Sequence, residues 1–471
     1  MNEKRRFMSR REFLRASMAG TAAAMIGLTG LDKAIAADNR PPNFVVILVD
    51  DLGYQDVGCF GSPLISTPNE DRMAREGIKF TSFYAQTVCT PSRAALLTGC
   101  YPTRVSLPRV LNPKDKIGIS SKEKTIADVL KTRGYTSACI GKWHLGWEKP
   151  FLPTHHGFDY FYGLPYSNDM GHGTNPPVPL MQGDRIIEQP VNQDTLTQRY
   201  TSEAIKFIEE NKDRPFFLYL AHTMVHIPLH VSEAFRGKSK RGLYGDAAEE
   251  VDWSTGQVMD TLKKLGLDDN TLVVFTSDNG PWLQQRENGG CALPLRDGKG
   301  TTYDGGVRVP CIIRWPGRIP AGLVSNEVVT EMDLLPTFAK LAGAEVPSDR
   351  IIDGKDIRPI LSGTHGAVSP HEVLFFYRDN RLQALRCGKW KMDLANEKKP
   401  VELYDMDADI GEKNDVAALY PSVVKKLSEM AENCRQDLGD AITHTEGKNR
   451  RAPGRVETAA NGPIQSQVNK K

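Results

Sequence analysis

Four oxygen-bearing side chains stand in two adjacent pairs, and each pair follows an apolar run of the sequence. Asp50 and Asp51 form the first pair, and Asp278 and Asn279 form the second. Neighbouring carboxylates repel each other unless a cation lies between them. Three carboxylates and one amide oxygen suit a hard divalent ion, Ca²⁺ or Mg²⁺, better than zinc. Each pair alone is typical of a turn, because Asp and Asn favour bends, but the two pairs together with the motifs below favour a metal site.

A cysteine stands just before an expected helix in the segment Cys89-Thr90-Pro91-Ser92-Arg93. We expect the helix to begin near Pro91 or Ser92, because proline suits the first helical turn. A helix N-terminus offers free N–H groups and positive potential to an anion, and Arg93 adds a charge-assisted contact. A bare cysteine at this position is either a thiolate of low pKa or a disulfide partner. Neither interpretation explains the rest of the segment.

Basic side chains follow two further apolar runs. Lys142 and His144 come after the run that begins at Thr136, and His226 comes after the run that begins at Phe216. Taken alone, Lys142 and His144 are typical of a solvated loop, and His226 is typical of a hydrogen-bonded structural histidine. Beside an anion site, the same residue types bind negative charge and transfer protons.

The apolar runs alternate with helical patterns, which predicts an α/β domain with a large, mostly parallel sheet between helices. We expect strands at 44–49, 136–140, 216–220 and 272–275, and helices at 69–76, 126–132, 201–210 and 247–265. In open α/β sheets, ligands bind beyond the carboxyl ends of the strands. The polar groups named above are therefore expected to meet at one rim of the sheet.

The pattern changes after about residue 365. Short apolar runs at 373–376, 383–386 and 390–392, followed by a helical pattern at 422–437, predict a small antiparallel sheet with one packed helix. We therefore expect a catalytic domain at 38–365 and a C-terminal α+β subdomain at 366–446. Residues 447–471 are polar with little apolar content, which predicts a disordered tail.

The first 37 residues have the features of an export signal. A basic start that includes Arg10 and Arg11 precedes an apolar run at 18–31 and a small-residue cleavage pattern at 34–36. The segment around the two arginines is similar to a twin-arginine motif, and the alternative is a basic amphipathic helix. We expect a periplasmic or secreted bacterial protein that uses the twin-arginine export machinery.

Composition excludes some other classes. The chain has 471 residues and a formal net charge of +2, with 25% charged and 40% hydrophobic residues. This is an ordinary globular composition, and it disfavours a nucleic-acid partner. The eight cysteines permit four disulfides, but their scatter disfavours a dense disulfide framework, and the lack of paired CxxC motifs disfavours structural zinc.

The motifs together resemble one family. The pattern CxPxR followed by AALLTG is similar to the motif of the formylglycine-dependent (type I) sulfatases, which belong to the alkaline phosphatase-like superfamily. The resemblance extends over nearly the whole chain after the signal, through PNFVVILVDDLGYQDVGCFG, GKWHLG, TSDNG and GGCALPLRDGKGTTYDGGVRVP. The last segment is most similar to arylsulfatase A and N-acetylgalactosamine-6-sulfatase types. The resemblance implies an alkaline phosphatase-like α/β sandwich with a small C-terminal domain.

The resemblance also implies a role for each residue of the motifs. Cys89 would be oxidised to formylglycine by a formylglycine-generating or a sulfatase-maturating enzyme, and its hydrated form would contact a single Ca²⁺ ion. Arg93 would hold that hydrate. The implied calcium ligands are Asp50, Asp51, Asp278 and Asn279, and the implied sulfate contacts are Lys142, His144, Ser167, His226 and Lys299.

The chemistry of a sulfate ester accounts for these residue types. The hydrate has two hydroxyl groups on one carbon, so one attacks sulfur and the other later expels sulfate. We expect His226 with Lys299 to protonate the leaving alcohol and His144 to assist the later elimination, with Asp278 as a candidate base for the attack.

The expected substrates are sulfated carbohydrates, with aryl sulfates as surrogates. One alternative is a phosphonate or phosphate monoester hydrolase of the same superfamily, and another is a catalytically idle carbohydrate-binding relative. The sequence leaves open the sugar, the sulfated hydroxyl, action at chain ends or within a polymer, and the oligomeric state.

Overall fold

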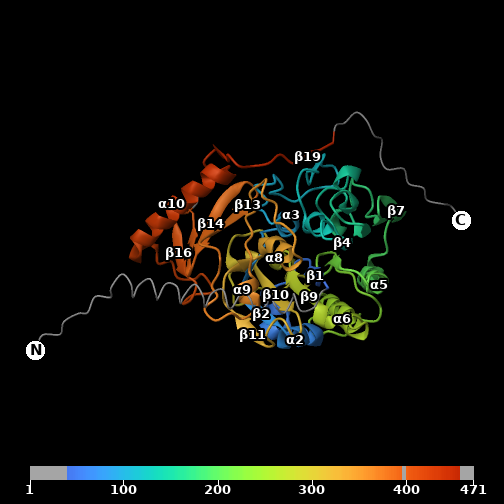
Figure 1. Ribbon diagram of the computed structural model, residues 1–471. Coiled ribbons are helices and arrows are strands. Elements are labelled where there is room, and N and C mark those ends of the chain that lie inside the picture. The colour runs from blue at the N-terminus through green and yellow to red at the C-terminus, as the bar shows by residue number, and fades with distance from the viewer. Residues whose placement is uncertain (1–39, 395–398, 457–471) are drawn as a thin grey trace, which may run out of the picture.

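A computed structural model of the chain describes residues 40–394 and 399–456 (Figure 1). One large sheet lies at its centre, and its strands are β1 (Asn43–Val49), β2 (Ile78–Tyr84), β4 (Thr136–Lys142), β5 (Tyr160–Leu164), β6 (Leu180–Gln182), β7 (Arg185–Glu188), β8 (Phe216–Ala221), β9 (Thr271–Ser277), β10 (Arg308–Arg314), β11 (Leu323–Ser325) and β12 (Val329–Thr330). Their order is β11-β2-β10-β9-β1-β8-β4-β5-β6-β7, with β12 beside β2. The strands from β9 to β5 run parallel, and β10 and β6 join them antiparallel on either side.

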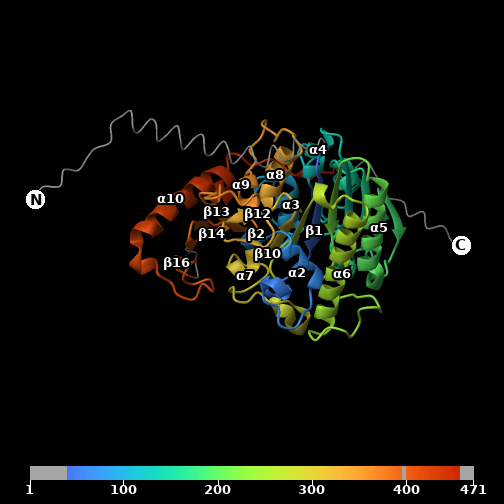
Figure 2. The same ribbon diagram turned by 60° about the horizontal axis from the view of Figure 1, so that its bottom comes forward.

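Helices cover both faces of this sheet, as Figure 2 shows for α5 and α6 on one side of β1 and α3 and α8 on the other. β1 is buried along its whole length, which is why it is a continuous apolar run. Its residues alternate between the two faces: Phe44, Val46 and Leu48 belong to one core cluster, and Val45 and Ile47 to the other. The helices of this region are α2 (Pro68–Arg75), α3 (Cys89–Thr98), α4 (Ile126–Lys131), α5 (Leu196–Glu210), α6 (Leu243–Lys264), α7 (Asp304–Val307), α8 (Leu334–Leu341) and α9 (Arg358–Leu361).

The helix α3 is buried on every side and ends at Gly99. Gly99 has a left-handed φ of 65°, and its N–H donates to the carbonyl of Ala95, which closes the last helical turn. Because α3 is surrounded by protein, its first residues are held at a fixed position relative to the sheet.

A second, small antiparallel sheet follows, as expected, and it has four strands. It contains β13 (Leu374–Arg378), β14 (Arg381–Cys387), β15 (Trp390–Asp393) and β16 (Glu402–Asp405), and α10 (Pro421–Leu438) packs on it. Strand β16 was not expected, because only Leu403 and Tyr404 of its four residues are apolar. A buried ion pair links the small sheet to α7, which directly precedes β10: Nζ of Lys391 lies 2.8 Å from Oδ1 of Asp304.

The expected disorder of the tail is wrong for residues 447–456. Here β19 (Gly454–Arg455) pairs antiparallel with β3 (Ile117–Gly118), after a short ladder of β17 (Gly439–Asp440) and β18 (Thr445–Glu446). Nε of Arg451 lies 2.8 Å from the carboxylate of Glu123. Ion pairing and strand pairing hold this segment although it buries little apolar surface. Residues 457–471 and the expected signal at 1–37 lie outside the described residues.

All eight cysteines have free thiols. Among the helices that the structure describes, none combines the length and apolar character of a membrane span.

Candidate active site

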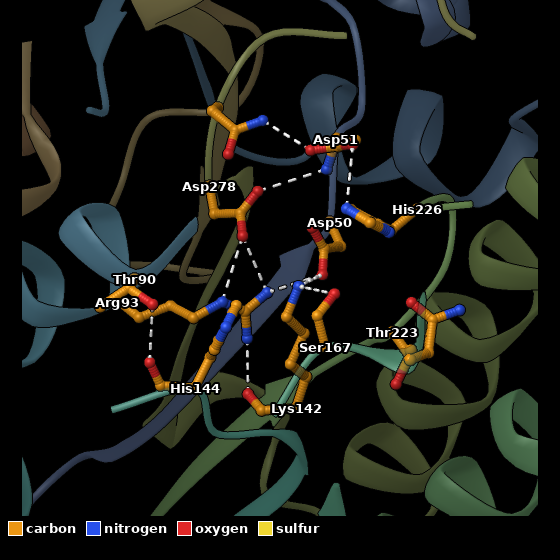
Figure 3. A network of polar contacts seen from close by, with 12 residues as sticks. Asp50, Asp51, Thr90, Arg93, Lys142, His144, Ser167, Thr223, His226 and Asp278 are labelled. Carbon is orange, nitrogen blue, oxygen red and sulfur yellow. Dashed lines mark hydrogen bonds and ion pairs between the residues drawn. The ribbon is translucent and has the colours of Figure 1, made fainter. Parts of the chain in front are cut away.

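Asp50, Asp51 and Asp278 lie close together (Figure 3), beyond the carboxyl ends of β1 and β9, and Asn279 follows Asp278 in the chain. These strands run parallel with Val49 opposite Ser277, so Asp50 and Asp278 leave the sheet side by side. Asp51 has a φ of 62°, a left-handed conformation that turns the chain at this point. Its amide N–H donates to Oδ1 of Asp278 at 3.2 Å.

The helix α3 brings Cys89 to these carboxylates. The helix begins at Cys89 itself, two to three residues before the expected start, so the positive end of the helix lies at this side chain. Sγ of Cys89 and one carboxylate oxygen each of Asp50 and Asp278 all lie within 4.8 Å of one another. The Cys89 residue is 2% exposed.

Arg93, one turn into α3, connects the helix to both carboxylates. Its Nε and Nη2 atoms donate to Oδ2 of Asp278 at 3.1 and 2.8 Å. Nη2 also lies 3.3 Å from Oδ2 of Asp50, and Nη1 donates to the carbonyl of Lys142. The guanidinium therefore balances two buried negative charges.

Lys142 is the last residue of β4, and its ammonium group lies on the other side of Asp50. Nζ donates to Oδ2 of Asp50 and, at 3.1 Å, to Oγ of Ser167. Ser167 follows β5, the strand next to β4 in the sheet. Both side chains are buried, so a cation and a hydroxyl group stand together beside the carboxylates.

His144 lies near the start of α3 with one ring nitrogen engaged. Its Nε2 atom is 2.9 Å from the carbonyl of Leu111, which accepts only, so Nε2 carries the hydrogen. Nδ1 has no hydrogen-bond partner among the described residues. Burial, with Lys142 and Arg93 nearby, holds the pKa of His144 well below its usual value. The ring is therefore neutral, with Nδ1 as a bare acceptor.

A second group of residues gathers around Asp51. Nζ of Lys299 lies 2.7 Å from Oδ1 of Asp51, and Nδ2 of Asn279 donates to the same oxygen at 2.7 Å. Nε2 of His226 lies 3.6 Å from Oδ2 of Asp51. The other nitrogen of His226, Nδ1, is 2.5 Å from the carbonyl of Ile227, so Nδ1 carries the hydrogen. Every residue that the sequence predicts for the site therefore lies in one cluster.

Two buried oxygen atoms of this cluster lack partners among the described residues: Oδ1 of Asp50 and Oδ1 of Asn279. A buried acceptor without a partner is costly, and a carboxylate oxygen more so. Oxygen atoms that no donor satisfies, next to two further carboxylates, match the oxygen ligands of a hard divalent cation. The acidic cluster therefore fits a metal ion.

The charges of the cluster shift its acid groups in opposite directions. Burial would raise the pKa of Asp50, but Lys142, His226 and Arg93 outweigh burial and hold that pKa below its usual value. Burial and the charge of Asp50 raise the pKa of Asp278. Burial also raises the pKa of the Cys89 thiol, against the influence of Lys142 and Lys299. A thiolate of low pKa, one of the two interpretations of a bare Cys89, is thus disfavoured, and so is the disulfide, since the thiol is free.

Sequence reasoning missed several contributors to the site. The hydroxyl of Thr90 donates to the carbonyl of His144 at 2.9 Å, and the hydroxyl of Ser277 accepts from the amide of Leu52 at 3.0 Å. Both lie inside motifs that were recognised, so their neighbours were a usable signal. Leu111 acts through its main-chain carbonyl, which no side-chain pattern reveals.

Comparison with known proteins identifies the family of the chain. The model of the family described as Sulfatase matches residues 42–344, and that described as N-sulphoglucosamine sulphohydrolase, C-terminal, matches residues 297–437. The chain is 40% identical to arylsulfatase A of Homo sapiens, with 86% of this chain and 89% of that protein covered. It is 41% identical to N-acetylgalactosamine-6-sulfatase of Canis lupus familiaris, with 79% and 76% covered.

The fold agrees as well. The crystal structure of the PsFucS1 sulfatase from Pseudoalteromonas sp. matches with a TM-score of 0.79 at 30% identity, over 90% of this chain and 96% of that one. The chain that contains this buried cluster of carboxylates, cations and Cys89 thus matches sulfatases both in sequence and in fold. The chain belongs to the sulfatase family and is a sulfuric ester hydrolase of the alkaline phosphatase-like superfamily.

Proposed function

We propose that this enzyme releases sulfate from sulfated carbohydrates of the galactose or N-acetylgalactosamine type, with residue 89 as formylglycine. The observation that carries the proposal is the position of Cys89, whose Sγ lies with oxygens of Asp50 and Asp278 inside a 4.8 Å group. The similarity to a relative named N-acetylgalactosamine-6-sulfatase supports the sugar class.

We propose Ca²⁺ as the metal, held by Asp50, Asp51, Asp278 and Asn279. The donor set contains only oxygen, which suits Ca²⁺. A bound Ca²⁺ supplies positive charge that polarises a sulfate ester, and a hydrated formylglycine supplies two hydroxyl groups on one carbon. Serine at position 89 would supply only one hydroxyl and could not release sulfate by the same route.

The residues around the cluster have the chemistry to bind the sulfate group. Nζ of Lys142 and Oγ of Ser167 lie 3.1 Å apart on one side of the carboxylates, and Nζ of Lys299 lies on the other side, beside Asp51. Two ammonium groups and a hydroxyl would offer several donors to the oxygens of a sulfate ester. Lys142 and Ser167 are buried and the side chain of Lys299 is only 9% exposed, so water screens their attraction to an anion little.

Two histidines offer complementary proton chemistry. Nδ1 of His226 is engaged by the carbonyl of Ile227, so Nε2 is the atom through which His226, beside Lys299, would pass a proton to the leaving alcohol. Nε2 of His144 is engaged by the carbonyl of Leu111, so Nδ1 is the atom that would accept a proton when sulfate is expelled. The nearest carbonyl fixes the reactive nitrogen of each ring.

The test has two parts. Peptide mass spectrometry of active enzyme should find residue 89 as formylglycine, and sulfate release should be measured on defined sulfated mono- and disaccharides with matched phosphate and phosphonate esters. We expect sulfate esters of galactose-type sugars to be the best substrates. An unmodified cysteine in fully active enzyme, or faster turnover of the phosphate or phosphonate esters, would contradict the proposal.

We also propose that Cys89 is oxidised before the chain folds, and that the folded protein is exported afterwards by the twin-arginine route. In the folded chain Cys89 is 2% exposed, so a modifying enzyme could reach it only in an unfolded segment. Cytoplasmic and periplasmic fractions should both contain formylglycine, and a variant with both Arg10 and Arg11 replaced by lysine should stay in the cytoplasm in modified form. Cysteine in the retained protein would show that oxidation depends on export.

A further inference from the structure

An indole ring stands beside the two residues that we expect to serve the leaving alcohol. Trp282 follows Asn279 by three residues, at the start of the short 3-10 segment Leu283–Asn288. Nζ of Lys299 lies 4.6 Å from the ring centroid of Trp282. The ring of His226 lies 5.7 Å from it, at an interplanar angle of 55°.

Burial places the indole on the solvent side of these two groups. The side chains of His226 and Lys299 are 3% and 9% exposed, whereas Trp282 is only half-buried. Both buried groups also contact Asp51, on the metal side of the cluster. A substrate that offers its leaving oxygen to His226 or Lys299 would therefore have the rest of its alcohol near Trp282.

The main chain fixes this position. The carbonyl of Pro281 accepts from the amide of Lys299 at 2.9 Å and from the amide of Leu283 at 3.1 Å. The carbonyl of Trp282 itself accepts from the amide of Gln285 at 3.0 Å. The segment before Trp282 and the segment of Lys299 share this carbonyl, so their main chains lie side by side, and the ammonium group of Lys299 reaches the indole ring from the neighbouring segment.

We propose that Trp282 determines substrate specificity by contacting the apolar C–H surface of a sugar ring whose sulfated oxygen points to His226 and Lys299. The inference rests on the proposed function and extends it, since Trp282 would favour sulfate esters of pyranose rings over those of flexible alcohols. A half-exposed aromatic ring offers a large, rigid apolar surface at little cost in conformational entropy. Binding pockets commonly combine such a surface with a few polar groups that fix orientation.

The competing interpretation is that Trp282 only positions Lys299 and does not contact the substrate. In that case Trp282 only holds Lys299 through a cation–π contact, and its loss would impair proton delivery to every substrate alike. The two interpretations therefore differ in whether the effect depends on the shape of the leaving alcohol.

The experiment compares Trp282→Ala and Trp282→Phe with a matched control elsewhere in the chain. Trp390 on β15 is also half-buried and also has a lysine Nζ, that of Lys389, 4.6 Å from its ring centroid. Trp390→Ala therefore removes an indole with a similar environment from the C-terminal sheet. The substrates are a 6-sulfated galactopyranoside and an acyclic polyol sulfate with a leaving alcohol of similar acidity.

We expect Trp282→Ala to lower kcat/KM for the pyranoside by about 10- to 100-fold, mainly through KM, and to change the polyol sulfate by less than about threefold. Trp282→Phe should recover much of the loss, and Trp390→Ala should match the wild type. Equal losses on the two substrates would overturn the inference and would support a role for Trp282 in positioning Lys299 alone.

A binding measurement removes the dependence on turnover. In a Cys89→Ala background, calorimetric binding of the sulfated pyranoside should weaken about tenfold or more when Trp282→Ala is added, and should not change with Trp390→Ala. Unchanged affinity would overturn the inference. Failure of the proposed function itself would look different, as a wild-type enzyme that releases no sulfate from any sugar ester.

Discussion

Two nitrogen atoms of Arg93 bind the same oxygen of Asp278, Nε at 3.1 Å and Nη2 at 2.8 Å. The contact joins α3, one turn after its start, to the residue that follows β9, so the helix that carries Cys89 and the strand that leads to Asp278 are held together by one side chain. Both partners are completely buried. The position of the helix that carries Cys89 and the charge balance of the cluster therefore depend on the same guanidinium.

Arg93→Met should lower the free energy of unfolding by about 3–5 kcal/mol, because the buried carboxylate of Asp278 loses the cation that pairs with it and Asp50 keeps only Lys142. Urea unfolding followed by circular dichroism would measure the change. Arg72→Met is the matched control, since its pair with Asp260 is solvent-exposed and should contribute no more than about 1 kcal/mol. Equal effects of the two substitutions would show that Arg93 is not needed to balance the buried charges.

His226→Ala should lower kcat by about 10²- to 10⁴-fold for sugar sulfates while the protein still binds metal, because a general acid is lost. The loss should be smaller for aryl sulfates, whose leaving groups need no proton. His155→Ala, at a half-exposed histidine that contacts Asp184, should leave both rates unchanged. If good and poor leaving groups suffered equally, His226 would not be the acid.

Removal of metal should abolish activity, and Ca²⁺ should restore it. Asp50 and Asn279 each keep one buried oxygen without a partner among the described residues, and those atoms should coordinate the ion. Calorimetry of chelator-treated protein should show a higher Tm after Ca²⁺ is added, with about 2.7 kcal/mol of stabilisation at a free concentration 100 times Kd. Asn279→Ala should weaken that effect. Full activity in excess chelator would refute the metal site.

The folded state should become less stable as the pH is lowered, because of His222. Burial lowers its pKa from 6.5 to about 3, and its Nε2 lies 3.2 Å from the hydroxyl of Ser254. Below pH 6.5 the unfolded chain binds a proton at this residue, whereas the folded chain does not until about pH 3. Unfolding free energy should therefore decrease as pH falls through this window. His222→Gln should reduce the slope by up to about 1.4 kcal/mol per pH unit, in urea titrations at several pH values. An unchanged slope would show that His222 is protonated in the folded state.

The meeting of Asp50 and Asp278 was predictable, because the carboxyl ends of parallel strands share one edge of a sheet. The same rule placed Lys142 at the site, since it ends β4. These two predictions needed only the ends of elements, which apolar runs mark well. Cys89 and Arg93 were assigned to the site by the resemblance of their motif to the sulfatase family, because the expected start of a helix does not by itself show which strands it meets.

Other features depend on conformations that the sequence does not display. Asp51 and His144 have φ values of 62° and 63°, although neither is glycine, and these turns aim their side chains. The tail around Arg451 was predicted to be disordered because it lacks apolar residues, whereas its order comes from partners hundreds of residues away. Such contacts have no local pattern.

The place of β1 and of the tail has a consequence for synthesis on the ribosome. Asn43 bonds Thr271 across 228 residues, and Ser106 bonds the carbonyl of Arg451 across 345. β1 cannot pair with β8 and β9 until residues 216–277 have been translated, and β3 cannot pair with β19 until residue 455 has been added. Until then the large sheet is incomplete, and the proposed oxidation of residue 89 would act on a chain that has not finished folding.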